Sequence, residues 1–377
     1  MGIGSLTSSD TSDFNTYGPS HLKSPDWTNP HYQTGVLSSL VNGVYTLERD
    51  RRLKQKKRYR LGLRKCPEPQ ADPWWEFFNF ELMKQLTDDD SSIYGAVFEY
   101  KSYSVCQNNP HVKVPQYVMA FRDTVLNSKT LICDFGLVLQ CMLNTLHRGG
   151  RPKHAFEEIR HMVDKHSDSV IWLAGHSSGA ALALIAGKTM MRSGCFLESH
   201  IFNPPFSSIP IEQIPGGSLF KHVFQTAKSV VKGTIGAIVN LPQVNFKSSN
   251  REDKSKAASW IHHLYVNPKD PICSGYMHYL ERRSAFSRIG ADGIEKLAAS
   301  ISYASELVGK FIGSSPSDLS KEPLYVLPSA DMTVNNSKPT KCTPAHALHQ
   351  WWERDPAVRE NWESCCIRSY RLKQLTL

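Results

Sequence analysis

A short segment, Gly175-His176-Ser177-Ser178-Gly179, constrains the fold of this chain more than any other feature of its sequence. It follows the apolar run VIWLA (170–174) and precedes the small-residue run AALALIAG (180–187). A buried strand that passes directly into a helix needs a sharp turn, and the glycines on either side leave room for it. Such a turn lifts the Ser177 hydroxyl above the edge of a sheet and aims the Ser178 N–H at an adjacent anion. We therefore take Ser177 as a candidate nucleophile.

Segments typical of strands and of helices alternate around this turn. The sequence predicts helices at 156–163 and 180–191, and strands at 96–100, 116–121, 170–174, 200–203 and 263–266. Alternation of this kind favours a mostly parallel sheet covered by helices. The length of 377 residues is enough for one large α/β domain or for two smaller ones.

The first quarter of the chain differs from the rest. Residues 1–25 are rich in Ser, Thr, Asp and Gly, which predicts a flexible tail. Residues 26–90 are predicted to form a helical, basic extension packed on the core, since apolar residues recur at helical spacing at Val36, Leu37, Leu40, Val41, Val44 and Leu47. An aromatic cluster in this segment predicts core packing: Trp74, Trp75, Phe77, Phe78 and Phe80.

The α/β domain is then expected over residues 91–377. Within it, residues 219–257 combine an apolar helical face with a polar run, which predicts a helical insertion. Two interpretations remain for this insertion: a mobile cap over a cleft, or a helix packed into the core.

Positive charge is concentrated in one segment. The ten basic residues and one acidic residue of Arg49–Lys65 carry the whole formal net charge of +9. A solvated helix face is one interpretation, and a peripheral contact with an anionic membrane is another. The candidate contact residues are Arg49, Arg51, Arg52, Lys54, Lys56, Lys57 and Arg58. Because the excess is local, we expect no nucleic-acid partner.

The cysteines indicate a reducing compartment. There are nine, an odd number without regular spacing or a CxxC pair, and the first residues lack the charged and apolar regions of a secretory signal. We therefore expect reduced thiols in a cytoplasmic protein that is at most peripheral to membranes.

A serine hydroxyl needs a base and an orienting acid to become a nucleophile at neutral pH. Asp270 follows the apolar strand 264–266, so its carboxylate is expected at the same sheet edge as Ser177, and Asp331 is the alternative. Three histidines follow Asp270 in the sequence: His278, His346 and His349. His278 stands very near Asp270 in the chain, and the order of residues does not separate the other two.

These motifs resemble the class 3 (fungal-type) lipases, in a plant branch of cytosolic proteins. The resemblance runs from about Trp27 to the C-terminus. Its carriers are VNGVYTLERD (41–50), YVMAFRDT (117–124), LAGHSSGAALAL (173–184), FNPP (202–205), YVNPKDPICSGY (265–276) and AHALHQWW (345–352). The resemblance implies an α/β-hydrolase fold and a serine carboxylic-ester hydrolase that acts on a lipid or other acyl ester, with no metal and no organic cofactor.

The resemblance also implies roles for particular residues. It makes Asp270 the acid and His346 the base, because the family's histidine precedes a small residue, a leucine and an aromatic residue; His349 is second choice. It makes Thr124 and Ser178 the oxyanion hole. Two residues depart from the family pattern: Asp123 stands where a glycine is usual, and Ser178 where a leucine is usual.

Asp123 adds bulk and negative charge where an oxyanion must form, which leaves other functions open. The first alternative is a catalytically weak or inactive signalling or scaffold protein that keeps the lipase fold. The second is an acyltransferase that uses the same Ser177, Asp270 and His346 with an alcohol as acceptor. A complete set of nucleophile, base and acid favours the ester hydrolase.

Overall fold

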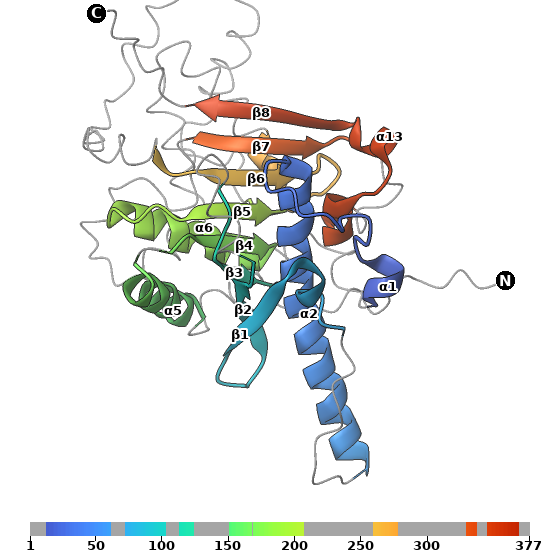
Figure 1. The fold of residues 1–377 in the computed structure, drawn as a ribbon, viewed down its shortest axis with the longest axis vertical. Helices are drawn as coiled ribbons and strands as arrows, with labels where there is room; N and C mark the ends of the chain where they lie inside the picture. Colours follow the sequence, from blue (N-terminus) through green and yellow to red (C-terminus); the bar gives the residue numbers. More distant parts are fainter. Residues whose placement is uncertain are drawn as a thin grey trace, which may run out of the picture.

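One eight-stranded sheet organises the molecule (Figure 1). The computed structural model describes residues 13–61, 72–102, 113–123, 151–167, 169–206, 259–277, 329–337 and 345–368. The strands lie side by side in chain order: β1 Phe80–Thr87, β2 Ile93–Tyr100, β3 Tyr117–Phe121, β4 Ile171–His176, β5 Glu198–Phe202, β6 His262–Val266, β7 Ser329–Asn335 and β8 Trp362–Arg368.

The five central strands, β3 to β7, run parallel, and the outer pairs β1–β2, β2–β3 and β7–β8 are antiparallel. Every described residue of β3 and β4 is buried, as expected for parallel strands covered on both faces. The carboxyl ends of the parallel strands meet at one edge of the sheet, which brings the residues after β3, β4, β5 and β6 together.

Helices cover both faces of the sheet. Helix α5 (Arg151–Lys165) and helix α6 (Ser178–Arg192) contribute to a core with Met119, Leu173 and Leu264. Helix α2 (Pro30–Leu61) packs on the other face, against the alternate strand residues, among them Ala174 and Phe202. Two apolar layers therefore enclose the sheet. Among the helices that are described, none is both long enough and apolar enough to span a bilayer.

The N-terminal half of α2 is enclosed rather than amphipathic. All residues from 34 to 44 are buried, including the polar Ser38 and Ser39, whose hydroxyls donate to carbonyl oxygens one turn earlier in the helix. The helix continues past the edge of the sheet (Figure 1) into the basic segment. The predicted helix over Val36 to Leu47 is thus confirmed, and it is longer than its apolar pattern.

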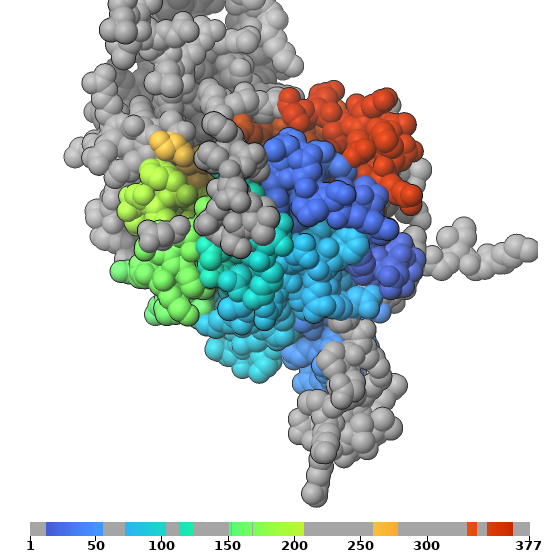
Figure 2. Space-filling view, in the orientation of Figure 1, coloured from blue at the N-terminus to red at the C-terminus, as the bar shows by residue number. Residues whose placement is uncertain are grey.

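Segments from the beginning and from the last part of the sequence lie side by side on one side of the molecule, where Figure 2 shows dark blue and red surfaces next to each other. Helix α1 (Phe14–Tyr17) buries Phe14 against Trp74, with ring centroids 5.0 Å apart. Trp352, in the 3-10 helix η4 (Leu348–Trp352), donates its indole N–H to the Tyr17 carbonyl oxygen at 2.9 Å. Of the predicted flexible tail 1–25, residues 13–25 are described, and Phe14 packs them against Trp74; residues 1–12 lie outside the described residues.

The predicted central strands and both predicted helices are present within a few residues of their expected limits. The aromatic cluster forms core as predicted, with Trp74, Phe78 and Phe80 at most 2% exposed. The expected boundary at residues 90 and 91 falls between β1 and β2, which pair in the same sheet. The insertion predicted at 219–257 and His278 lie outside the described residues.

Candidate active site

The turn between β4 and α6 holds Ser177 in a constrained backbone conformation. Ser177 has φ 55° and ψ −124°, values that a non-glycine residue adopts only where the surrounding structure enforces them. Its N–H donates to the Phe202 carbonyl oxygen at 3.0 Å. A Cβ at Gly175 would lie 2.2 Å from the Gly179 carbonyl oxygen, and one at Gly179 would lie 2.4 Å from the Phe121 oxygen. Both glycines are therefore required, and the strand-turn-helix predicted around Ser177 is present.

Asp270 lies in the turn after β6, at the same edge of the sheet, and is fully buried. Its Oδ2 accepts from Asn203 Nδ2 at 2.7 Å and from His346 Nδ1 at 2.8 Å. Its Oδ1 accepts from the Ile272 N–H at 3.0 Å. Burial raises the pKa of Asp270, but the charge of His346 and these side-chain hydrogen bonds outweigh burial and leave the pKa below its ordinary value. Asp270 is an ionised acceptor at neutral pH.

His346 therefore uses Nδ1 to donate to Asp270, and in the neutral ring Nε2 carries the lone pair. Among the described residues Nε2 has no hydrogen-bond partner, although the atom is buried. Burial lowers the pKa of His346, but the charges of Asp270 and Asp123 and the hydrogen bond to Asp270 raise it above the ordinary histidine value. A histidine oriented by a carboxylate and open at its second nitrogen has the arrangement of a general base.

His176, the residue before Ser177, connects the turn to the His346 segment. Its Nε2 lies 2.7 Å from the His346 carbonyl oxygen, and the two rings are 4.8 Å apart. A carbonyl oxygen only accepts, so His176 Nε2 carries the hydrogen and Nδ1 accepts from the Tyr45 hydroxyl at 2.8 Å. Burial, together with the charge of His346, lowers the pKa of His176 to about 3, so the ring is neutral.

Tyr45, on α2, extends this chain of hydrogen bonds to the end of β3. Its hydroxyl oxygen accepts from the Asp123 N–H at 2.9 Å. One hydroxyl thereby joins the segment after β3, the turn after β4 and, through His176, the segment that carries His346. The role of Tyr45 was not predicted, although it stands in the motif VNGVYTLERD. No local pattern reveals a contact between residues so far apart in the chain.

The two departures from the family pattern contact each other. The Ser178 hydroxyl donates to the Asp123 carboxylate in a short hydrogen bond. Ser178 is also the first residue of α6, so its N–H lies at the positive end of the helix. A leucine at position 178 has no hydroxyl to donate, and a glycine at position 123 has no carboxylate to accept. The Asp123 carboxylate is thus tethered to the turn that carries Ser177.

Two buried amides brace the acid and the histidine. Asn203, in the left-handed region at φ 47°, donates to Asp270 and to the Ala345 carbonyl oxygen and accepts from Trp351 Nε1 at 2.7 Å. Gln350 donates to the carbonyl oxygens of Ala345 and Ala347, at 2.6 and 3.0 Å. His346 lies between these two carbonyls, so its backbone is fixed on both sides. The FNPP motif contains Asn203 and was the available signal for it.

The remaining predicted residues fall elsewhere. His349 is an exposed residue of η4, whereas the hydrogen bond to Asp270 comes from His346. Asp331 lies inside β7, paired with His263, four residues before the strand ends at Asn335. Thr124, the expected second residue of the oxyanion hole, lies outside the described residues.

The only group of metal-ligand side chains found among the described residues lies away from this edge, at Glu198, His200 and His263. The residues around Ser177 are a hydroxyl, an imidazole and a carboxylate, the set that nucleophilic acyl transfer uses without a metal.

Comparison with known proteins gives matches to lipases and esterases. Residues 109–207 match the family described as lipase (class 3). The protein "GDSL esterase/lipase At4g10955" of Arabidopsis thaliana is 37% identical over 357 residues, which cover 92% of this chain and 96% of that protein. The tetrapeptide GDSL does not occur in this chain, whose serine stands in GHSSG.

Solved structures show weaker likeness. A lipase from Rhizopus microsporus var. chinensis is 12% identical, with 64% of this chain and 68% of that chain covered and a TM-score of 0.29. A ferulic acid esterase is 14% identical, with 57% and 88% covered and a TM-score of 0.28. The sheet, its helices and the turn at Ser177 make this an α/β-hydrolase fold. The chain belongs to the class 3 lipase-like family that includes the Arabidopsis protein.

Proposed function

We propose that this carboxylic ester hydrolase cleaves an acyl ester through Ser177, His346 and Asp270. The family supplies the reaction class, a lipase-type ester hydrolysis. The observation that carries the assignment of residues is the 2.8 Å hydrogen bond from His346 Nδ1 to the buried Asp270, which leaves Nε2 for the nucleophile.

In this proposal the Ser177 hydroxyl oxygen attacks the acyl carbon while His346 Nε2 accepts its proton. Asp270 stays ionised and stabilises the imidazolium that forms. His346 then gives the proton to the leaving alcohol oxygen, and water releases the acyl group by the reverse steps. The Ser178 N–H at the start of α6 stabilises the oxyanion, with Thr124 as the proposed second donor.

Asp123 has a defined part in the proposal. A carboxylate directed at the oxyanion would oppose catalysis, but the Ser178 hydroxyl holds this one. Its charge acts on His346, whose pKa it raises. The tether therefore supports an active hydrolase over the alternative of an inactive scaffold. The proposed substrate is a lipid or another acyl ester.

Labelling with a fluorophosphonate probe tests the nucleophile. Such probes react covalently with activated serines, so we expect labelling of the wild type and none of Ser177→Ala. Ser193→Ala, at an exposed serine just after α6, is the matched control and should label normally. Labelling that persists in Ser177→Ala, or a wild type that does not label, would contradict the proposal.

We also propose a peripheral membrane contact through the basic end of α2 in a cytoplasmic protein. Three of the candidate residues pair within the helix: Arg51 and Arg52 with Glu48, and Lys54 with Asp50 at 2.9 Å. Lys56, Lys57 and Arg58 follow, on the part of α2 that extends past the sheet (Figure 1). Their place later in the helix makes these three candidates for a contact with anionic lipid.

A further inference from the structure

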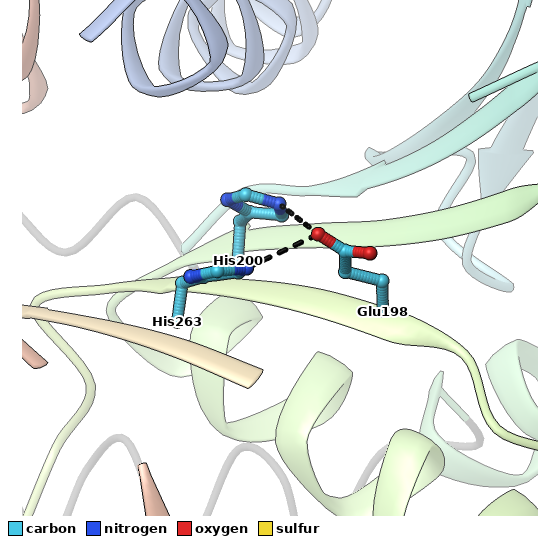
Figure 3. A group of neighbouring side chains, drawn as sticks. All are labelled: Glu198, His200 and His263. Carbon is cyan, nitrogen blue, oxygen red and sulfur yellow. Dashed lines mark hydrogen bonds and ion pairs between the residues drawn. The ribbon is translucent and has the colours of Figure 1, made fainter. Parts of the chain in front are cut away.

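A second cluster of chemically functional side chains lies in the amino-terminal parts of β5 and β6, away from the edge that carries Ser177. Glu198 and His200 belong to β5, and His263 of β6 pairs with His200 in the strand register. Figure 3 shows the Glu198 carboxylate reaching toward both imidazoles. One ligand atom from each residue lies within 4.8 Å of the other two. We propose that this cluster binds a divalent transition-metal cation, with Zn²⁺ as the best match.

The types and spacing of the donor atoms fit such an ion. Two histidine nitrogens and one carboxylate oxygen are a common protein ligand set for Zn²⁺, with water in the fourth position. Ligands of a tetrahedral zinc ion lie about 3.3 Å apart. Glu198 Oε1 lies 3.1 Å from His263 Nε2 and 3.8 Å from His200 Nε2.

The hydrogen bonds around His200 determine which nitrogen holds its lone pair. The Thr34 hydroxyl lies 2.7 Å from the Pro30 carbonyl oxygen, which only accepts, so Thr34 donates its single hydrogen there. The Tyr265 hydroxyl, 3.2 Å from Thr34 Oγ1, can then donate to Thr34. Tyr265 thereby remains an acceptor for His200 Nδ1–H, at 3.0 Å.

This order leaves His200 Nε2 with a lone pair that faces the Glu198 carboxylate. His200 is fully buried, and within the described part of the chain Nε2 has no hydrogen-bond partner. Two electron-rich atoms facing each other in a buried space favour a cation between them.

The negative charge of Glu198 also favours a bound cation in this cluster. Its side chain is only 12% exposed, and its ion-pair partners among the described residues are these two histidines. No lysine or arginine that is described pairs with it, and a bound divalent cation would neutralise it.

For all three residues to bind one ion, one of the two imidazole rings must rotate. The rings of His200 and His263 are stacked, 4.4 Å apart and 24° from parallel. Nearly parallel rings cannot both aim an in-plane lone pair at one ion. His263 has a side chain that is 24% exposed, so its ring can rotate and open a path for water and the ion. His200, held by Tyr265, stays fixed.

The bound ion would stabilise the sheet without taking part in ester cleavage. Glu198 begins β5, and Asn203, which binds Asp270, follows its end five residues later, so Glu198 and Asn203 lie about 16 Å apart along the strand. Metal binding therefore has a readout that is independent of the proposed hydrolysis: an ion that binds the folded chain raises its melting temperature.

The test is metal binding to the full-length chain after removal of metals with a chelator. We expect one Zn²⁺ per chain by titration calorimetry and a Tm that rises with Zn²⁺ concentration. Glu198→Gln and His263→Ala should each weaken binding about tenfold or more. Both positions are partly exposed, so these variants are expected to fold. His161→Ala removes an exposed histidine of α5 and should bind as the wild type does.

Cobalt(II) separates this site from binding by the nine cysteines of the sequence. Co²⁺ held by nitrogen and oxygen should give weak visible bands without the intense near-ultraviolet absorption of a cobalt–thiolate bond. The proposal is overturned by a thiolate spectrum, by the absence of stoichiometric Zn²⁺ binding, or by equal affinity in Glu198→Gln and His263→Ala. Hydrolase activity does not enter any of these outcomes.

Discussion

At the scale of residues, the site is a set of groups whose charges are fixed by their neighbours. Asp270 is buried and ionised because His346 and Asn203 donate to it. His346 keeps Nε2 open because Nδ1 is engaged. Asp123 adds a negative charge whose position the Ser178 hydroxyl fixes. The basicity of His346 therefore depends on two carboxylates rather than one.

The pH profile measures this dependence. A general base acts when neutral, so kcat/KM should rise with pH through the pKa of His346 in the free enzyme. Because that pKa is raised, we expect the acid limb above pH 6.5, the ordinary histidine value. Asp123→Asn removes one stabilising charge from the imidazolium, which lowers the pKa and moves the limb to lower pH.

The matched control for this profile is Asp164→Asn, an exposed carboxylate on α5 that should leave the limb in place. A limb that stays fixed in Asp123→Asn, or that moves to higher pH, would show that Asp123 does not act on His346.

At the scale of elements, α2 is held to the sheet by a buried ion cluster as well as by apolar packing. Glu48 is 1% exposed and accepts from Arg51, Arg52 and the Ile93 N–H. The equally buried Arg122, just after β3, lies 3.6 Å from it. Burial raises the pKa of Glu48, but these partners lower it to about 2. The cluster ties α2 to β2 and to the residues beside Asp123.

Glu48→Gln should therefore destabilise the fold. The change leaves the buried Arg122 without a carboxylate, a loss of about 3 kcal/mol in the free energy of unfolding. Glu81→Gln breaks the exposed pair with Lys101 and should cost less than about 1 kcal/mol. Urea unfolding of both variants measures the contrast, and equal effects would show that burial of Glu48 contributes nothing.

The difference in the free energy of unfolding between the wild type and Glu48→Gln should depend on pH. Glu48 has a pKa depressed from 4.5 to about 2 in the folded chain. Its contribution to stability is fully present above pH 4.5 and is lost as the pH falls through 2. The difference between the wild type and Glu48→Gln should shrink over that range.

The elements that the sequence predicts well are those with a continuous apolar pattern. Strand β4 and helix α6 are buried along most of their length, so their sequences predict them directly. The outer strands β1, β7 and β8 were not predicted. Strand β1 alternates poorly and keeps five of its eight residues exposed, because an edge strand is covered on fewer sides. Asp331, the alternative to Asp270, lies inside β7 rather than after a strand.

The residues of the candidate active site also differ in how well the sequence predicts them. Ser177 and Asp270 follow buried strands, so the sequence alone placed both at the sheet edge. His346 and His349 share one segment, and only three-dimensional contacts, including those of Gln350, decide which of them faces Asp270. Tyr45 and Asn203 act through contacts between distant segments, for which no spacing rule exists.

At the scale of the whole molecule, the candidate active site, the proposed metal cluster and the basic segment lie in different places. The proposed catalytic residues lie at the carboxyl edge of the sheet, the proposed metal cluster lies in the amino-terminal parts of β5 and β6, and the basic segment lies in the C-terminal part of α2. These three regions can therefore be altered one at a time.

Vesicle co-sedimentation tests the basic segment. We expect the chain to bind vesicles that contain anionic lipid, with less binding in 1 M salt, because screening weakens charge contacts. Replacing Lys56, Lys57 and Arg58 by alanine should reduce binding, whereas replacing Lys153 and Arg160 on α5 should not. Binding that does not change with salt concentration, or that is equal for neutral vesicles, would contradict the proposed membrane contact.

The most direct test of the account is the hydrolysis of a series of p-nitrophenyl esters, from short to long acyl chains, by the wild type and four variants. We expect kcat/KM to fall about 10⁴-fold or more in Ser177→Ala and in His346→Ala. His349→Ala should stay within a few-fold of the wild type, and Asp123→Gly should remain active. Wild-type activity that survives Ser177→Ala, or that is lost in His349→Ala and kept in His346→Ala, would contradict the assignment. A wild type that hydrolyses none of these esters would contradict the proposed hydrolase activity itself.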